Sequence, residues 1–195
     1  MDGELLWEWW AADHGYDETP SGVRRTSARG REHRDVYYHT RFQSTHVNSA
    51  LVTGENDRYV LALLFHQGQL IRIDRTLPAE KQRGEIILDG LLRPHALEKT
   101  PHGWMFANSF GGEVVFLDEA LSRCGRIPYD AGWIQDCTML SDGRVLLNDV
   151  DNHVILEYET WTSNSPSKAM KYDDNWRIAE LVEIRDSLDA RAKVG

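Results

Sequence analysis

Cysteine, long apolar runs and positive charge are all scarce in this chain. Two cysteines, Cys124 and Cys137, in 195 residues are too few for a disulfide framework, so a reducing cytoplasmic setting is expected. No stretch approaches the roughly 18 uninterrupted apolar residues of a membrane span, and the opening MDGELLWEWW has no basic region typical of a signal peptide. Lys and Arg number 22 against 31 Asp and Glu, a net charge of −9. This charge argues against nucleic acid or an anionic membrane as the partner.

The familiar short catalytic motifs are also missing. The chain has no Gly-rich phosphate loop, CxxC pair, HExxH, GxSxG or EF-hand pattern. Its length and its 41% of apolar residues nevertheless suffice for one domain with a buried core. Any chemistry must therefore be inferred from the way the chain is organised.

The strongest signal in the sequence is internal repetition. A small or polar residue followed by a strand-like run occurs four times, and the openers are 65, 44 and 40 residues apart. The four segments are Gly3–Trp9, Gly68–Asp74, Gly112–Asp118 and Asn152–Tyr158. The last two intervals are typical of propeller blades, which repeat about every 40–50 residues.

Each of the last three openers belongs to a longer unit. A strand and a tight polar turn precede it, as in Arg58–Phe65 before Gly68, which indicates a β-hairpin. A further strand comes earlier, at Asn48–Thr53, His95–Lys99 and Asp136–Leu140, and a weaker fourth strand follows, at Gly84–Leu88, Gly125–Tyr129 and Ser167–Tyr172. Four short antiparallel strands at a fixed interval predict an all-β chain of β-propeller blades rather than a sandwich.

The number of blades is about three and a half, which leaves closure of the ring open. Residues 1–195 form one propeller domain or part of one, with an irregular Arg-rich insertion at 11–44 and a tail at 175–195 that is a strand or a short helix. Closed propellers have four to eight blades, and an open sheet exposes edges that invite pairing. The alternatives are a ring built from several chains, a piece of a longer protein, or a four-blade ring completed by the tail. We favour the first, so the expected partner is a second copy or another chain.

Propeller geometry places the starts of the first strands, and the turns between second and third strands, around one mouth of the channel. Such a concave polar site suits a small-molecule ligand. The candidate catalytic residues are His46, His95 and Asp136, and the candidate substrate-binding residues are Asn48, Asn108, Asn148 and Arg93. His46, His95 and Asp136 could also ligate one divalent ion, zinc through nitrogen or calcium or magnesium through oxygen.

Simpler interpretations stand beside these. Asn and Asp in tight turns often bond only their own backbone, and His66 is interpreted as a spare surface histidine. Cys137 and Trp133 are interpreted as core residues. The basic cluster of the insertion either holds an anion over the mouth or is a solvated loop; it consists of Arg24, Arg25, Arg29, Arg31 and Arg34.

Residues 44–160 resemble a broad superfamily of propellers. His46-Val47-Asn48-Ser49 and Pro94-His95-Ala96-Leu97 resemble the channel-mouth histidines of arylsulfotransferase-type propellers, which implies a histidine nucleophile or acid–base. Gluconolactonase and strictosidine-synthase-like propellers hold a divalent ion with Glu, Asn and Asp. Asn108, Asp136 and Asn148 are similar to that set, but no matching Glu is evident.

The functional hypothesis is a propeller enzyme acting on a small anionic molecule. The reaction would be hydrolysis, lactone opening or rearrangement, hydrolase- or lyase-like and assisted by a metal ion or by histidine acid–base chemistry. The alternatives are a non-catalytic propeller binding module, since fold alone does not fix function, and one part of a ring assembled from several chains.

Overall fold

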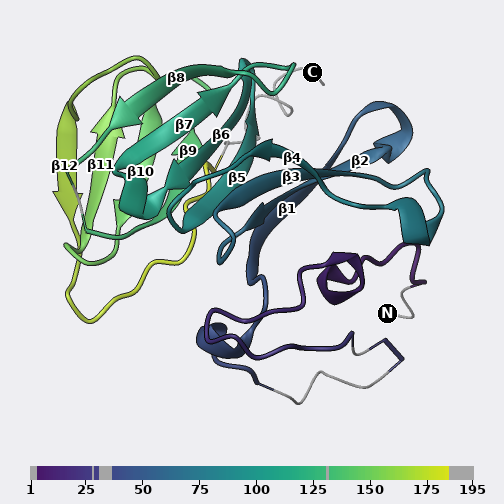
Figure 1. The fold of residues 1–195 in the computed structure, drawn as a ribbon. Helices are drawn as coiled ribbons and strands as arrows, with labels where there is room; N and C mark the ends of the chain where they lie inside the picture. Colours follow the sequence, from purple (N-terminus) through teal and green to yellow (C-terminus); the bar gives the residue numbers. More distant parts are fainter. Residues whose placement is uncertain (1–3, 28, 31–36, 131, 185–195) are drawn as a thin grey trace, which may run out of the picture.

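A computed structural model describes residues 4–27, 29–30, 37–130 and 132–184. Three four-stranded antiparallel sheets follow one another along the chain (Figure 1). The strands of the first sheet are β1 (Val47–Thr53), β2 (Tyr59–Leu64), β3 (Gln69–Asp74) and β4 (Glu85–Leu88). Those of the second are β5 (Pro94–Thr100), β6 (Gly103–Asn108), β7 (Glu113–Leu117) and β8 (Arg123–Pro128). Those of the third are β9 (Ile134–Met139), β10 (Val145–Asp149), β11 (Val154–Tyr158) and β12 (Lys168–Lys171).

In each sheet the strands pair in chain order, which confirms the predicted repeat of four antiparallel strands. The other elements are short 3₁₀ turns, namely η1 (Ala11–His14), η2 (Thr40–Phe42), η3 (Glu55–Asp57), η4 (Ala79–Lys81) and η5 (Ser109–Gly111). No helix among the described residues is long and apolar enough to cross a bilayer.

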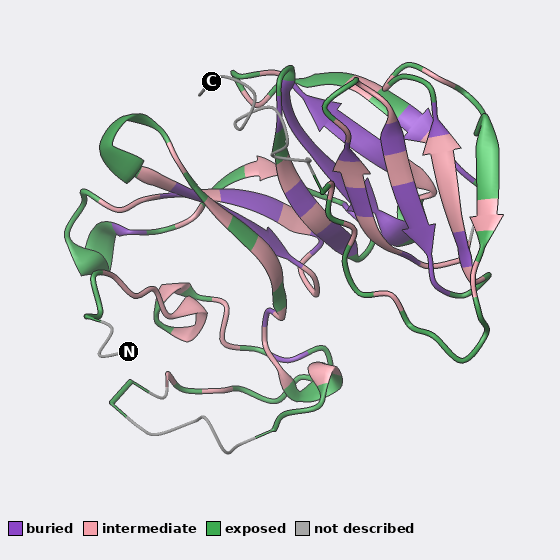
Figure 2. Ribbon diagram, turned by 180° about the vertical axis from the view of Figure 1, so that it is seen from behind, coloured by how far each residue is buried: buried purple, intermediate pink, exposed green. Residues whose placement is uncertain are grey.

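The sheets pack face to face because alternate residues of each strand point to opposite faces. Leu61 and Leu63 of β2 face Phe106 of the second sheet, and Met105 on the opposite face of β6 joins Leu147 of the third sheet. Strand β6 is buried throughout for this reason, since both of its faces are covered (Figure 2). At each interface the burial of apolar area stabilises the fold by roughly 25 cal/mol per Å².

The first strand of each sheet lies innermost. Strand β1 contacts β5, and β5 contacts β9, so the three inner strands stand side by side. Their starts meet at one end, which is the arrangement that the sequence predicted for a channel mouth.

The first sheet's outward face is covered by the N-terminal segment. Trp7, Trp9 and Tyr16 pack against a cluster that includes Val60 and Ile71. The indole of Trp7 donates to Gln82 Oε1 at 3.0 Å, and that of Trp9 donates to the Gln82 carbonyl at 2.9 Å. Residues 4–10 form no strand, so the partial blade predicted at Gly3–Trp9 is wrong for the described part of that segment. Its tryptophans cover a sheet face instead of extending a sheet.

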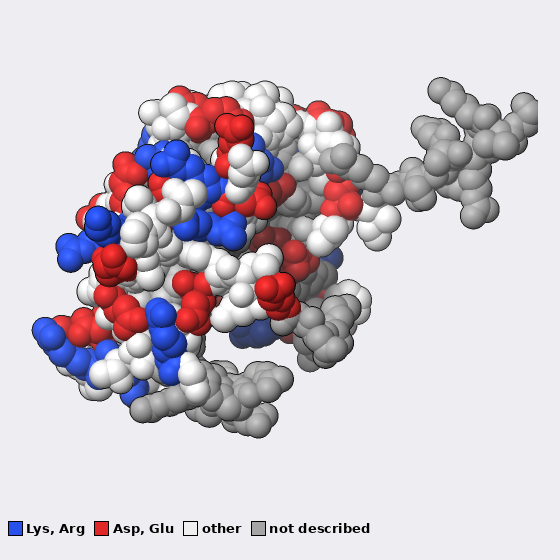
Figure 3. Space-filling model, turned by 90° about the vertical axis from the view of Figure 1, so that its right-hand side faces the viewer, with Lys and Arg blue, Asp and Glu red and all other residues white. Residues whose placement is uncertain are grey.

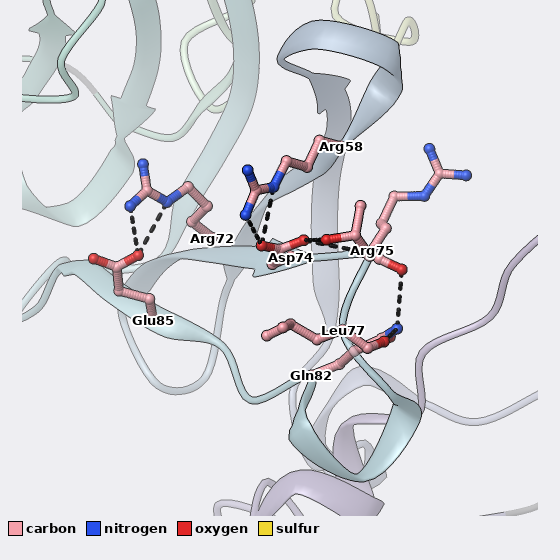
Figure 4. Close-up of polar contacts among 8 residues, drawn as sticks. Arg58, Arg72, Asp74, Arg75, Leu77, Gln82 and Glu85 are labelled. Atoms are coloured by element: carbon pink, nitrogen blue, oxygen red, sulfur yellow. Dashed lines mark hydrogen bonds and ion pairs between the residues drawn. The ribbon is translucent and has the colours of Figure 1, made fainter.

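Ion pairs across neighbouring strands support this first sheet. Arg58 contacts Asp74 at 2.7 Å and Arg72 contacts Glu85 at 2.6 Å, while Gln82 donates to the Leu77 carbonyl (Figure 4). The Arg58 guanidinium holds the pKa of the Asp74 carboxyl well below its usual range. Over this side of the molecule basic and acidic side chains are interspersed (Figure 3).

The predicted insertion at 11–44 is irregular where the structure describes it, with two 3₁₀ turns and one isolated bridge between Glu18 and Arg24. The described part of the tail, residues 175–184, is neither strand nor helix. The rest of the predicted tail element lies outside the described residues.

Candidate functional site

A pocket of about 760 Å³ opens where the three inner strands begin. We call it the strand-start pocket. Its wall repeats from sheet to sheet. In each sheet the residue directly before the inner strand lines the pocket, and these residues are His46, Arg93 and Trp133. The second residue of each inner strand also lines it, and these residues are Asn48, His95 and Gln135. The remaining lining residues come from turns and connections, and are Pro20, His39, Thr40, Arg41, Phe65, His66, Leu91, Leu92 and Phe110.

Local backbone geometry aims these side chains. His46 and Arg93 have φ of 47° and 54°, so both occupy the left-handed region directly before an inner strand. Non-glycine residues adopt that region at a cost of about 1–2 kcal/mol, and such strain often marks a functional site. Gly68, with φ of 64°, lets the Leu91 segment approach, because a Cβ there would lie 2.0 Å from the Leu91 carbonyl oxygen. The same left-handed conformation thus occurs directly before the inner strand in the first and second sheets, and it sets the direction in which the His46 and Arg93 side chains leave the backbone.

Three histidines in this pocket have their tautomers fixed by carbonyl groups, which can only accept hydrogen bonds. His95 Nδ1 lies 3.0 Å from the Arg93 carbonyl, His46 Nδ1 lies 2.7 Å from Gln43 Oε1, and His66 Nε2 lies 2.9 Å from the Thr40 carbonyl. Each of these nitrogens therefore carries the hydrogen. The second nitrogen of each ring, His95 Nε2, His46 Nε2 or His66 Nδ1, is left with a lone pair for a ligand.

Burial keeps two of these rings neutral. Desolvation lowers the pKa of His95 from 6.5 to about 4, against an opposing contribution from its bond to the Arg93 carbonyl. Desolvation also lowers the pKa of His46, and the neighbouring His66 adds to that effect. At neutral pH both are uncharged bases.

The aromatic rings contact the histidines of the pocket. Phe65 makes edge contacts with both His46, at 5.1 Å, and His95, at 5.3 Å between ring centroids. Trp133 contacts His95 at 4.6 Å. The guanidinium of Arg93 lies 4.3 Å from the Phe110 ring centroid. Rings in edge contact hold one another in fixed orientations.

The electrostatic character of the pocket is one-sided. Its lining includes Arg41, Arg93 and four histidines, and no Asp or Glu is among the described residues that line it. Neither arginine side chain has an ion-pair partner in the described chain, whereas Arg58, Arg72 and Arg144 do. A guanidinium lying on an aromatic face keeps its N–H edge available for a carboxylate, phosphate or sulfate.

A second space, which we call the central cavity, adjoins the pocket. It measures about 640 Å³ and shares Asn48, His95 and Gln135 with it. The inner strands form three of its walls, and residues 179–183 of the tail form another. In contrast to the pocket, it holds the half-buried carboxyls of Glu98 and Asp136.

Asp136 faces the tail rather than the strand-start pocket. Its Oδ2 accepts a hydrogen bond from the Leu181 N–H at 2.6 Å, and burial raises its pKa from 3.8 to about 6. The pKa of Glu98 is also raised by burial, although Thr138 and the Met139 N–H donate to it. The structure therefore does not bring Asp136 together with His46 in one pocket, although Asp136 and His95 both line the central cavity.

The described residues do not fit the predicted metal centre. No group of three or more His, Cys, Asp or Glu side chains among them is placed to hold a metal ion. His46 lines the strand-start pocket and Asp136 the central cavity, and of the three predicted ligands His95 alone lines both spaces. The bound divalent ion remains a prediction.

Two of the predicted substrate-binding residues have structural partners. Asn108 is 6% exposed, accepts from the Leu92 N–H at 2.7 Å and donates to Glu113. Asn148 is 0% exposed and donates to the Ile178 carbonyl at 2.6 Å. Asn48 and Arg93 line the strand-start pocket with His46 and His95, and Asn48 also donates to the Pro94 carbonyl at 3.1 Å. The substrate-binding role of all four candidates, the three asparagines and Arg93, remains a prediction.

The other candidate residues from the sequence are Cys137 and the arginines of the insertion. Cys137 is 2% exposed and burial raises its pKa, which suits a packing role. Arg29 pairs with Glu8 at 3.5 Å and Asp13 at 3.4 Å, Arg24 with Asp17 at 3.7 Å, and Arg25 donates to the Phe42 carbonyl. These three arginines therefore have partners within the chain. Arg31 and Arg34 lie outside the described residues.

Sequence reasoning missed His66, Phe110 and the role of Trp133. Trp133 directly precedes an inner strand, as His46 and Arg93 do, so its position could have signalled a place in the pocket. His66 and Phe110 belong to the turns after β2 and β6, which face the same mouth. Comparing equivalent positions of the repeats therefore locates the pocket residues better than searching the sequence for chemically reactive side chains.

Comparison with known proteins supports the fold. No family model and no curated protein sequence matches the chain. Solved β-propeller structures do match it. Kuenenia stuttgartiensis hydrazine synthase aligns with a TM-score of 0.50 and 14% sequence identity, over 71% of this chain and 41% of that chain. A streptogramin B lyase aligns with a TM-score of 0.50 and 10% sequence identity, over 66% of this chain and 41% of that chain. Virginiamycin B lyase from Staphylococcus aureus aligns at 0.46 and 14%, over 62% and 40%.

These likenesses establish the class of protein but no activity. The chain has an all-β fold of three four-stranded antiparallel sheets that matches part of a β-propeller. It aligns with less than half the length of the propeller chains it resembles. The narrower resemblance to gluconolactonase-type or arylsulfotransferase-type propellers remains a prediction.

Proposed function

We propose that the strand-start pocket binds a small anionic molecule with a planar or aromatic part. The observation that carries this is the absence of carboxylates from the described lining, in a chain of net charge −9, beside two arginines with no acidic partner. Arg93 would hold the anionic group, and Phe110 and Trp133 would pack against the planar part. An ionised partner roughly doubles the strength of a hydrogen bond, which favours an anion over a neutral analogue.

On such a ligand His95 and His46 would act as acid–base groups. Both rings are neutral at pH 7, so the first step open to them is removal of a proton from substrate or water by a free ring nitrogen. The imidazolium formed would return that proton to the leaving group, which regenerates the neutral ring. Hydrolysis, lactone opening and rearrangement all fit this cycle.

A matched pair of probes tests the binding. Naphthalene-2-carboxylate and the uncharged 2-naphthamide share a ring system, and calorimetry gives the affinity of each. We expect the carboxylate to bind more tightly, and Arg93→Gln to weaken it about tenfold while leaving the amide nearly unchanged. Arg126→Gln, an exposed arginine of β8 that does not line the pocket, is the control. Equal affinity for both probes, or an unchanged affinity in Arg93→Gln, would contradict the proposal.

A second assay tests the acid–base step. Hydrolysis of the anionic aryl ester 4-acetoxybenzoate is measured for the wild type, His46→Gln and His95→Gln. Each substitution should lower the rate about a hundredfold, whereas His102→Gln, an exposed histidine that lines neither space, should retain it. If the carboxylate probe binds but both pocket variants keep the wild-type rate, the histidines have no acid–base role. If the probe binds but the wild type hydrolyses the ester no faster than buffer does, the alternative of a non-catalytic binding module holds.

A further inference from the structure

The tail repeats a backbone contact that otherwise belongs to inner strands. In β5 the Leu97 N–H donates to Ser49 Oγ at 2.8 Å, and in β9 the Met139 N–H donates to Glu98 Oε2 at 3.3 Å. In the tail the Leu181 N–H donates to Asp136 Oδ2 at 2.6 Å. In every case the acceptor belongs to the inner strand of the preceding sheet. Leu97, Met139 and Leu181 are spaced 42 residues apart.

The start of each of these segments repeats a second contact. The carbonyls of Pro94 and Ile134, the first residues of β5 and β9, accept from the preceding sheet's Asn48 at 3.1 Å and Ser109 at 2.7 Å. The Ile178 carbonyl accepts from Asn148 of the third sheet at 2.6 Å. Residues 178–183 therefore stand where the inner strand of a fourth sheet would stand, and they form a wall of the central cavity as β1, β5 and β9 do.

Unlike the three inner strands, this tail segment belongs to no sheet in the described chain. Strands β1, β5 and β9 each pair with the next strand of their sheet, whereas residues 176–184 pair with no strand in the described chain. Val182 and Ile184 are 73% and 88% exposed. A segment in the position of an inner strand, with exposed apolar side chains, is suited to contact with another chain.

Exposed apolar groups gather at the opposite end of the molecule too. Leu5 and Leu6 are 73% and 81% exposed on the N-terminal segment that covers the first sheet. On that sheet's outward face, Val52 and Ile86 are 53% and 50% exposed. Large apolar patches on a soluble protein mark contact surfaces.

We propose that the tail end of one copy of this chain docks against the first-sheet end of a second copy. The contact is head to tail, so it joins two different surfaces, and two such contacts close a ring of two copies. Each copy aligns with 41% of the propeller chains above, so two copies approach the length of one such chain. The second copy's first sheet would then face the tail across the central cavity.

The molar mass in solution gives the first test. Light scattering under reducing conditions, which prevent disulfides through the exposed Cys124, should give twice the chain mass of 22.4 kDa. A monomer at concentrations up to 100 µM, or a series of larger open assemblies, would overturn the proposal. A monomer is also the result expected if this face is instead covered by a further segment of the same chain.

Variants at the two ends test the geometry. Val182→Asp and Leu6→Asp, both at exposed positions, should each weaken dimerisation at least tenfold while circular dichroism shows the strand content of the wild type. Cys124→Asp adds the same charge on β8 of the middle sheet and should leave the dimer unchanged.

Mixing the two end variants separates head-to-tail from like-to-like contact. In the mixture, the intact tail of Leu6→Asp meets the intact first sheet of Val182→Asp, so dimers should reappear through one undamaged contact. A like-to-like interface predicts the reverse, because each single variant would keep one undamaged contact and a mixed dimer would keep none. Single variants that dimerise with themselves but form no mixed dimer would overturn the head-to-tail arrangement.

Discussion

The strand-start pocket and the central cavity are built from the same three inner strands, yet their chemistry is opposite. The pocket holds arginine, histidine and aromatic groups with no carboxylate in its described lining, whereas the cavity holds Glu98 and Asp136. His95 borders both. The difference follows from position along the strand, because residues at the strand start face the mouth and later residues face the tail. One repeating scaffold can thus present two environments a few residues apart.

Groups in the two spaces should change the free energy of unfolding with pH in opposite directions. The largest expected effect comes from His95. Its pKa falls from 6.5 to about 4 on folding, so between these values the unfolded chain binds more protons. Its contribution to the free energy of unfolding should therefore fall by about 2–3 kcal/mol as the pH drops from 7 to 4. Urea unfolding of the wild type and His95→Gln at both pH values measures this, with His102→Gln as control. An equal pH dependence in wild type and His95→Gln would contradict it.

The anchor of the tail gives the next largest effect. Asn148 is fully buried, donates to the Ile178 carbonyl, and accepts from the Tyr172 hydroxyl at 3.0 Å. Asn148→Ala should lower the free energy of unfolding by about 2 kcal/mol, since it leaves buried polar groups without partners. It should also speed tryptic cleavage after Arg177. Asn175→Ala, at an exposed position two residues from Arg177, is the control, and equal cleavage rates in the two variants would refute this anchoring role.

Asp136 should respond to pH in the direction opposite to His95. Its pKa rises from 3.8 to about 6 on folding, so its contribution to stability is present below pH 3.8 and is lost as the pH rises through 6. Relative to the wild type, Asp136→Asn should gain about 1 kcal/mol between pH 4 and pH 8, allowing for the partial exposure of the carboxyl. The free energies of unfolding of both proteins at the two pH values measure this gain. A difference that does not change with pH would show that the carboxyl is not perturbed by burial.

The smallest effect expected is that of Tyr172→Phe. This change removes one hydrogen bond to Asn148 and keeps the aromatic ring, so the free energy of unfolding should fall by about 0.5–1 kcal/mol. Chemical denaturation compares it with Asn148→Ala. A loss as large as that of Asn148→Ala would mean that the hydroxyl, and not the bond to the tail carbonyl, holds this wall of the cavity.

The sequence predicted the strands well because their pattern is local. Short apolar runs such as Arg58–Phe65 and Gly68–Asp74 are separated by turn residues, and the structure forms β2 and β3 there. The same pattern at Gly3–Trp9 misled, since Trp7 and Trp9 cover the first sheet and make hydrogen bonds to Gln82. Strand-like composition does not decide whether a segment pairs in a sheet or packs on one.

The candidate site was predicted in part for a related reason. Equal positions in the repeat correctly placed His46, Asn48, Arg93 and His95 around one mouth. Asn108 and Asn148, predicted from turn positions, do not line this pocket and instead bond backbone groups, because a hairpin turn can direct a side chain inward. Nothing in the repeat indicated that the tail would lie against Asp136.

By itself the sequence determined the repeat, the four-stranded sheets and the ring of equivalent positions, since these depend on side-chain alternation and turn chemistry between near neighbours. The tertiary structure decided which polar residues share a space, which ones serve as backbone partners, and where the two terminal segments lie. Those outcomes depend on packing between sheets more than 40 residues apart in the chain, where burial and the pairing of backbone groups outweigh local preference.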